Sequence, residues 1–182
     1  SKRSFLYYEN SPKSNSIHYL PMGSKLSVKR IVNNWAEVYL SNKHNLKTAY
    51  VPQKHIVNIN NKVDDWVFIA EQLVGIPYRW GGRDTLGIDC SALLQLCYEA
   101  YGEIIPRNTG EQVKINKPII KKISDLRRGC VVFWERHVGI MIDQLNCIHA
   151  NAFHMEVSKE PLVNILERNG KNNPIIKIMN FN

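Results

Sequence analysis

Residues 77–82 (PYRWGG) and 87–91 (GIDCS) form the stretch that decides the fold, because they lead a glycine-rich approach into one cysteine, Cys90. Glycine permits the tight or positive-φ backbone that brings a chain close to a substrate. Residues 91–101 then carry apolar side chains at helical spacing, and Gly102 ends the pattern, so Cys90 is predicted at a helix N-terminus. There the unpaired backbone N–H groups and the helix dipole favour thiolate over thiol, and the same N–H groups can donate to a developing oxyanion.

The chain of 182 residues has three further cysteines, and their surroundings differ from those of Cys90. Cys97 lies inside the predicted helix on its apolar face, while Cys130 and Cys147 lie in apolar runs of strand character. We expect these three to pack in the core. Four cysteines without an evident disulfide pattern favour a reducing compartment.

Two of the six histidines lie in predicted strands and suit the chemistry of a cysteine nucleophile. His137 opens an apolar strand, and His149 lies inside the next one. A thiol at a helix start with two imidazoles supplied by a sheet is how a cysteine hydrolase activates its nucleophile. The remaining histidines have no such context and are expected at the surface or in packing roles: His18, His44, His55 and His154.

The loop between these two strands decides whether the two imidazoles meet. Period-2 alternation across an even-length loop would put His137 and His149 on opposite faces, so an odd loop or a bulge is needed. With Ile142 opposite Asn146, His149 faces Gly139 and becomes a diagonal neighbour of His137, about 7–8 Å away between backbones. This register favours glycine at position 139, because a side chain there would stand between the two rings.

Six separated blocks carry a common set of motifs: residues 77–82, 87–91, 106–109 (PRNT) with Gln112, 132–134 (VFW), 137–140 (HVGI) and 148–150 (IHA). In this order they resemble the motifs of the NlpC/P60 cysteine peptidases, papain-like enzymes that cut peptide bonds in the bacterial cell wall. The resemblance covers residues 64–160 and implies a papain-like catalytic domain of α+β class.

The resemblance implies a catalytic role for four residues. Cys90 would be the nucleophile, His137 the general base and acid, and His149 the third polar residue that orients His137. Tyr78 corresponds to the motif tyrosine of the family, whose hydroxyl is placed near the reacting carbonyl and assists the oxyanion hole. No metal and no cofactor are implied.

Five further residues are predicted to line the substrate cleft. In family members that need a free substrate N-terminus, the positions of Asp89 and Ser91 help to hold its ammonium group. Helix capping explains the same two residues equally well, so both alternatives stay open. Asn108 stands where related peptidases often carry Asp near the cleft, and we place Thr109 and Trp80 beside it.

The first third of the chain has a different pattern. Residues 17–59 hold short β-rich runs broken by turn signals, which predicts a small barrel, and their motif order resembles bacterial SH3 (SH3b) domains. We therefore expect an all-β SH3b barrel in residues 1–60 and the catalytic domain in residues 61–182. The barrel would either tether the enzyme to the wall or form one side of the cleft. Tyr39 and Tyr50 are candidates to reach the cleft, and barrel packing explains them equally well.

Charge and hydropathy narrow the class of partner. The net charge of +8 fits an anionic partner, and wall peptides carry free carboxylates. The charge is spread along the chain and the tryptophans suit cores or the cleft, so nucleic acid is not expected. There is no apolar run of about eighteen residues, hence no expected membrane span. The first residues lack the apolar region of a signal peptide, which leaves the bacterial cytoplasm and the cell envelope both open.

These observations predict a cysteine peptidase that acts on peptidoglycan peptides through a thioester. By resemblance, the bond is the γ-D-glutamyl to diamino acid bond of a muropeptide. An amidase or acyltransferase on the same fold is an alternative, because it would share the triad. A non-catalytic wall-binding protein would predict a degraded triad. The oligomeric state is left open.

Overall fold

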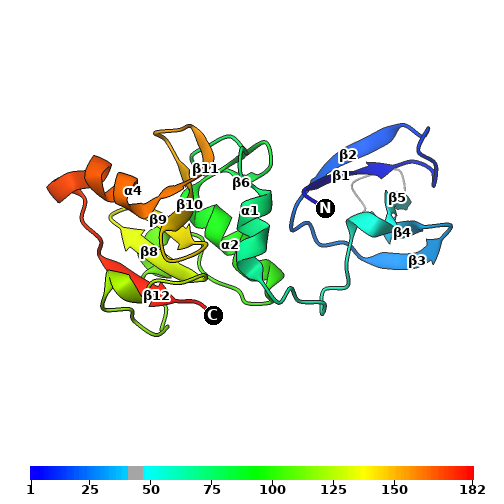
Figure 1. Ribbon diagram of the computed structural model, residues 1–182. Coiled ribbons are helices and arrows are strands. Elements are labelled where there is room, and N and C mark those ends of the chain that lie inside the picture. The colour runs from blue at the N-terminus through cyan, green and yellow to red at the C-terminus, as the bar shows by residue number, and fades with distance from the viewer. Residues whose placement is uncertain (41–46) are drawn as a thin grey trace. The chain divides into compact units, whose positions relative to one another are not determined.

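The computed structural model describes residues 1–40 and 47–182, so His44 lies outside the described residues. The chain divides into two compact units, Ser1–Asn61 and Lys62–Asn182, each with its own sheet (Figure 1). None of the helices in the described ranges has the length and apolar character needed to cross a bilayer.

Over its described residues, the first unit forms one antiparallel sheet of five strands in the order β2-β1-β5-β4-β3. Its elements are β1 Arg3–Tyr7, β2 Ser16–Pro21, β3 Val28–Val32, β4 Trp35–Tyr39, β5 Thr48–Pro52 and the 3-10 helix η1 Gln53–His55. Alternate strand residues point inward and form a small core of Leu6, Ala36, Val38, Ala49 and Val51. The predicted all-β character of this unit is therefore confirmed.

Three details of the first unit differ from the predictions. Within the described residues β2 and β3 are unpaired sheet edges, so the strands do not close into the predicted barrel. Strand β1 was not among the predicted runs, because its two inward positions are occupied by Ser4 and Leu6 and alternate only weakly. The β-rich runs were expected to extend to residue 59, but the last strand ends at Pro52 and His55 ends η1, with its Nδ1 2.9 Å from Ser4 Oγ.

The second unit, described throughout, combines a five-stranded antiparallel sheet with helices, which confirms the α+β class. The sheet has the order β11-β10-β9-β8-β12. Its strands are β8 Cys130–Trp134, β9 His137–Met141, β10 Asn146–Asn151, β11 Glu156–Pro161 and β12 Lys177–Asn180. The helices are α1 Trp66–Gln72, α2 Cys90–Ala100, α3 Thr109–Gln112 and α4 Leu162–Asn169, with 3-10 turns η2 Ile123–Asp125 and η3 Gly170–Asn172. A two-stranded pair, β6 Arg83–Asp84 and β7 Gly87–Ile88, precedes α2.

Both faces of this larger sheet are covered by apolar side chains. Leu162 and Ile165 of α4 pack on one face against Cys130, Met141 and Cys147. Alternation sends the intervening strand residues to the opposite face, and α2 packs against β9 and β10. Cys97, Cys130 and Cys147 are fully buried, as predicted. The sheet therefore supports α2 and the residues at its N-terminus.

Candidate active site

Cys90 is the first residue of α2, as the sequence predicted, and Asp89 is its N-cap, which is one of the two alternatives that the sequence left open. The residue Cys90 is 6% exposed. The approach to it requires glycine, because a Cβ at Gly82 would collide with the carbonyl oxygen of Gly87. Backbone hydrogen bonds from Arg79 N to Ile88 O and from Ile88 N to Pro77 O then hold this loop against the helix start.

The carboxylate of Asp89 is surrounded by donors. It accepts the Ala92 N–H at 2.8 Å, the Gly81 N–H at 3.0 Å and the Ser91 hydroxyl at 3.0 Å. Arg107 adds a bidentate pair, with Nη1 to Oδ1 at 2.8 Å and Nη2 to Oδ2 at 2.6 Å. Burial alone would raise the pKa of this carboxyl, but the hydrogen bonds from Arg107 and Ala92 outweigh it and hold the pKa below its usual 3.8. Asp89 is therefore a carboxylate with its lone pairs occupied.

The two predicted histidines meet. Ile142 N donates to Asn146 O, and Cys147 pairs with Met141, so the register is the one that the odd loop required. Nε2 of His137 and Nδ1 of His149 lie 2.7 Å apart.

Gly139 is tightly enclosed, but the atoms nearest to it are not those of the two rings that the sequence predicted. A Cβ there would lie 2.5 Å from Cys147 Sγ and 3.6 Å from His149 Cβ. The first atom in its way is therefore the cysteine sulfur, followed by Cζ3 of Trp134 at 3.4 Å and then by Cβ of His149.

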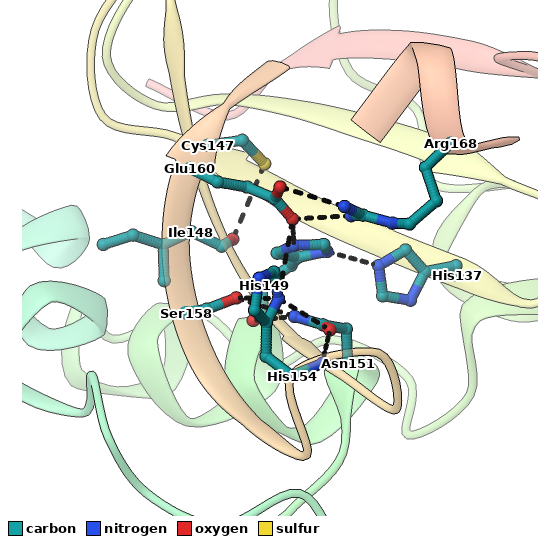
Figure 2. A network of polar contacts seen from close by, with 9 residues as sticks. All are labelled: His137, Cys147, Ile148, His149, Asn151, His154, Ser158, Glu160 and Arg168. Atoms are coloured by element: carbon teal, nitrogen blue, oxygen red, sulfur yellow. Dashed lines mark hydrogen bonds and ion pairs between the residues drawn. The ribbon is translucent and has the colours of Figure 1, made fainter. Parts of the chain in front are cut away.

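The polar chain continues beyond the histidines (Figure 2). Nε2 of His149 lies 2.8 Å from Oε1 of Glu160, and the guanidinium of Arg168 contacts both oxygens of Glu160, at 2.6 and 3.1 Å. The four side chains come from β9, β10, β11 and α4. Burial raises the pKa of Glu160, but Arg168 and His149 lower it further, so the residue is a carboxylate. His149 stays neutral because burial lowers its pKa more than Glu160 raises it.

The protonation state of Cys90 differs from the prediction. The helix start was expected to favour thiolate, and backbone N–H groups of Val138 and Ser91 do act in that direction. Burial is the larger effect, and with the charge of Asp89 it raises the pKa of Cys90 to about 11. Burial and the neighbouring His149 also lower the pKa of His137 well below 6.5. The resting pair is therefore a thiol and a neutral imidazole.

The Cys90 thiol lies beside the turn that carries His137. Its sulfur is 4.0 Å from the carbonyl oxygen of Arg136 and close to the N–H of Val138, which flank His137 in sequence. Within the described residues no hydrogen bond joins Cys90 Sγ to the His137 ring. Nδ1 of that ring has no hydrogen-bond partner in the same part of the chain.

Cys90 opens into a cavity of about 330 Å³. It is lined by Trp80, Gly81, Asp89, Cys90, Ser91, Arg107, Asn108, Thr109 and Arg136. Every residue that was predicted for the cleft in the second unit lines this cavity, and Trp80 is 78% exposed. Tyr78 lies near Cys90 and Asp89, which together with burial raise the pKa of its hydroxyl. Tyr50 belongs to the first unit, on β5 opposite Glu37, so its role at the cleft stays a prediction.

Several residues of the site were missed by sequence reasoning. Arg107 lies inside the matched block 106–109 but received no role. Glu160 carried no motif signal, because only its place on the strand beside β10 brings it to His149. His154, expected to be without context, lies 3.1 Å from both Asn151 Oδ1 and Ser158 Oγ through its Nδ1.

His149, His154 and Glu160 also have the composition of a metal-binding group, with donor atoms within 4.8 Å of one another. Arg168 already occupies both carboxylate oxygens of Glu160, and Glu160 accepts from His149. A cation would have to displace this guanidinium, so hydrogen bonding explains the group better than metal binding.

Comparison with known proteins agrees with this geometry. Residues 75–168 match the model of the NlpC/P60 family, and this range includes both Cys90 and the two histidines. The chain belongs to the NlpC/P60 family. Its relatives include a protein of Haemophilus influenzae named as a probable endopeptidase NlpC homolog, 29% identical over 150 residues, which span 78% of this chain and 75% of the relative.

Two further similarities extend over more of the chain. A γ-D-glutamyl-L-lysine dipeptidyl-peptidase of Bacillus cereus is 27% identical over 172 residues, which span 86% of this chain but only 50% of that protein. The crystal structure of an NlpC/P60 family protein from Bacillus cereus superimposes with a TM-score of 0.71 at 23% identity, covering 99% of this chain and 61% of that one. The NlpC/P60 match supports the predicted α+β fold of the second unit, and the chain spans only part of these longer relatives.

Proposed function

We propose that this chain is a cysteine peptidase that hydrolyses peptide bonds of peptidoglycan, with Cys90 as nucleophile and His137 as general base and acid. One observation carries the proposal: the His137–His149 hydrogen bond of 2.7 Å lies next to a helix-start thiol that contacts the backbone on both sides of His137. Membership of the family and relatives named as peptidases support it.

The reaction begins from a neutral thiol and a neutral imidazole. The Cys90 proton passes to Nδ1 of His137 as sulfur bonds to the scissile carbonyl carbon, and the oxyanion accepts from the Cys90 backbone N–H and the Tyr78 hydroxyl. His137 returns the proton to the leaving amine as the C–N bond breaks, which leaves a thioester. Water, deprotonated by His137, attacks the thioester, and the C–S bond breaks to release a carboxylate and restore the thiol.

The bond we propose is the one between γ-D-glutamate and the diamino acid of a wall peptide. The Bacillus cereus relative is named for a γ-D-glutamyl-L-lysine substrate, which supports this choice. Arg136 lines the cavity, and its positive charge suits the free carboxylates of such peptides, whereas the charge of Arg107 is paired with Asp89. Asn108 and Thr109, on the same wall, are proposed to contact the peptide.

The environment of Asp89 supports its capping role over ammonium binding. Five donor contacts occupy its oxygens, two of them from Arg107. Ser91 donates to Asp89 and accepts from Arg107 at 2.8 Å, so it is also engaged. A substrate ammonium group could bind Asp89 only by displacing Arg107.

For the first unit we propose an SH3b-type module that either binds the wall or forms one side of the cleft. Tyr39 is 56% exposed and is a candidate for wall contact. Tyr39→Ala and Tyr50→Ala should be compared in sedimentation with purified peptidoglycan and in peptide cleavage. If the unit is a tether, the variants should lose sedimentation with peptidoglycan while they still cleave soluble peptides. If it forms one side of the cleft, they should lose cleavage while they still sediment.

The deciding experiment is digestion of defined wall peptides, with free and acetylated N-termini, followed by mass spectrometry. We expect cleavage after γ-D-glutamate that disappears in Cys90→Ala, while Cys97→Ala, a core cysteine, retains it. Products joined to an added amine would instead indicate an acyltransferase. A wild-type chain that sediments with peptidoglycan but cuts no peptide would indicate a non-catalytic binding protein.

A further inference from the structure

The structure allows us to assign which atom donates and which accepts in each hydrogen bond of the chain behind His137. Three side chains from adjacent strands lie in line, with His137 Nε2 2.7 Å from His149 Nδ1, and His149 Nε2 2.8 Å from Glu160 Oε1 (Figure 2). Glu160 is 8% exposed, and Arg168 holds its carboxylate from α4 at 2.6 and 3.1 Å. The end of the chain is therefore a fixed group that accepts hydrogen bonds.

A carboxylate only accepts, whereas a neutral imidazole donates from one nitrogen and accepts at the other. Next to Glu160, His149 must carry its proton on Nε2, which leaves Nδ1 bare. That bare Nδ1 can only accept, so Nε2 of His137 must donate to it. Because His137 is also neutral, its Nδ1 is left without a proton.

We propose that Glu160 is a positioning residue that sets the ring tautomer of His149 and, through it, of His137, so that Nδ1 of His137 faces the reaction as the proton acceptor. This inference rests on the proposed function, in which that nitrogen takes the proton of Cys90. The reverse tautomer would put a hydrogen on Nδ1 of His137 and leave it unable to accept the thiol proton. A histidine held in the wrong tautomer loses most of its value as a base.

Arg168 supports this role rather than competing with it. Its Nη2 donates to Oε1 at 2.6 Å, alongside His149, and its Nη1 donates to Oε2 at 3.1 Å. Together these contacts fix the plane of the carboxylate and keep Oε1 within hydrogen-bond reach of His149. The other charged or titratable groups that act on His149 are His154 and Arg168, and neither offers an acceptor to its Nε2. Glu160 is the acceptor that the described neighbours provide.

The test compares Glu160→Leu, which removes the acceptor, with Glu160→Gln, which keeps an oxygen at that position. Glu167→Leu changes an exposed glutamate of α4 and is the matched control. For cleavage of the defined wall peptide, we expect kcat to fall on the order of 10- to 100-fold in Glu160→Leu with KM unchanged, as for other residues that orient a functional histidine. Glu160→Gln should recover most of the loss, and Glu167→Leu should match the wild type.

A second readout does not depend on activity. Two-bond ¹H–¹⁵N spectra of the ¹⁵N-histidine protein report which ring nitrogen carries the proton, and His137→Gln and His149→Gln assign the signals. We expect His149 protonated at Nε2 in the wild type and in Glu160→Gln, with Nδ1–H signal appearing in Glu160→Leu. Wild-type His149 protonated at Nδ1, or unchanged kcat in folded Glu160→Leu, would overturn the proposal.

These outcomes separate the two proposals from each other. If circular dichroism shows that Glu160→Leu does not fold, the wild-type spectrum and the activity of Glu160→Gln still decide the role of Glu160. If Cys90→Ala still cuts the peptide, the proposed function fails, while the tautomer of His149 remains measurable and tests Glu160 by itself.

Discussion

Replacement of Arg107 by methionine should destabilise the second unit by leaving the carboxylate of Asp89 without its bidentate partner. Asp89 is 7% exposed, and removal of one member of a buried ion pair typically costs about 3–5 kcal/mol. The Arg107 side chain is 30% exposed, so water can replace part of it, and three other donors remain on Asp89. We therefore expect a loss of about 2–3 kcal/mol at pH 7. At about 4 °C per kcal/mol, Tm should fall by about 8–12 °C.

The pKa of Asp89 predicts how the stability difference between wild type and Arg107→Met changes with pH. In the wild type the pKa of Asp89 lies below 3.8, so its stabilising contribution is present above pH 3.8 and is lost as the pH falls through the folded-state value. Without Arg107, burial is opposed by fewer donors, so this pKa rises from its wild-type value. The folded variant then gains a proton at a higher pH than the folded wild type. The difference between wild type and variant should therefore shrink as the pH is lowered from 7 to 4.

Urea unfolding followed by tryptophan fluorescence measures this difference. A Trp35→Phe background removes the tryptophan of the first unit, so Trp66, Trp80 and Trp134 report the second unit alone. Arg127→Met, at an exposed arginine, should stay within about 0.5 kcal/mol of the parent. A loss below about 1 kcal/mol, or one equal at pH 7 and pH 4, would refute the reasoning.

Three other perturbations follow from the same contacts. Gly139→Ala brings a Cβ within 2.5 Å of Cys147 Sγ, so it should cost about 1–3 kcal/mol in urea unfolding and lower kcat; unchanged values would contradict the packing described. The rate of Cys90 alkylation by iodoacetamide should keep rising up to about pH 11, where its thiol titrates, whereas a plateau near pH 7 would indicate a resting thiolate. The pKa of Glu37, which accepts from Lys29 and Arg30, is lowered from 4.5 to about 2. The first unit should therefore lose stability as the pH falls from about 4.5 to 2, and Glu37→Gln should flatten that acid dependence in circular dichroism.

The parts of the site that could be predicted are those set by neighbours in the chain. Asp89 caps the helix that begins at Cys90 because a short polar side chain can reach the N–H three residues ahead. His137 and His149 meet because alternation and an odd hairpin loop, both local properties, leave one register in which Gly139 faces His149. Helical spacing alone assigned Cys97 to the core, where it is fully buried.

The partners of these residues could not be predicted, because they are chosen by packing across long separations in the chain. Arg107 reaches Asp89 from a loop beyond α2, and Glu160 reaches His149 only because β11 pairs with β10 in one particular register. Strand β1 depends similarly on β2 and β5, and closure of the first sheet into a barrel depended on strand edges that do not pair within residues 1–40 and 47–61. Any of several acidic or basic residues has the right chemistry for such contacts.

The sequence by itself determined the position of Cys90 at a helix start and the pairing of the two histidines, since helical spacing and the hairpin register encode them. Its motif blocks also resembled those of the family, which the match over residues 75–168 shows. Only the tertiary structure decided the state in which these groups rest. Whether Cys90 is thiol or thiolate depends on the balance between a helix start and desolvation, and burial has the larger effect. Which nitrogen of His137 is free depends on Glu160, two strands away. Both follow from burial and partner choice, which exist only once the chain has folded.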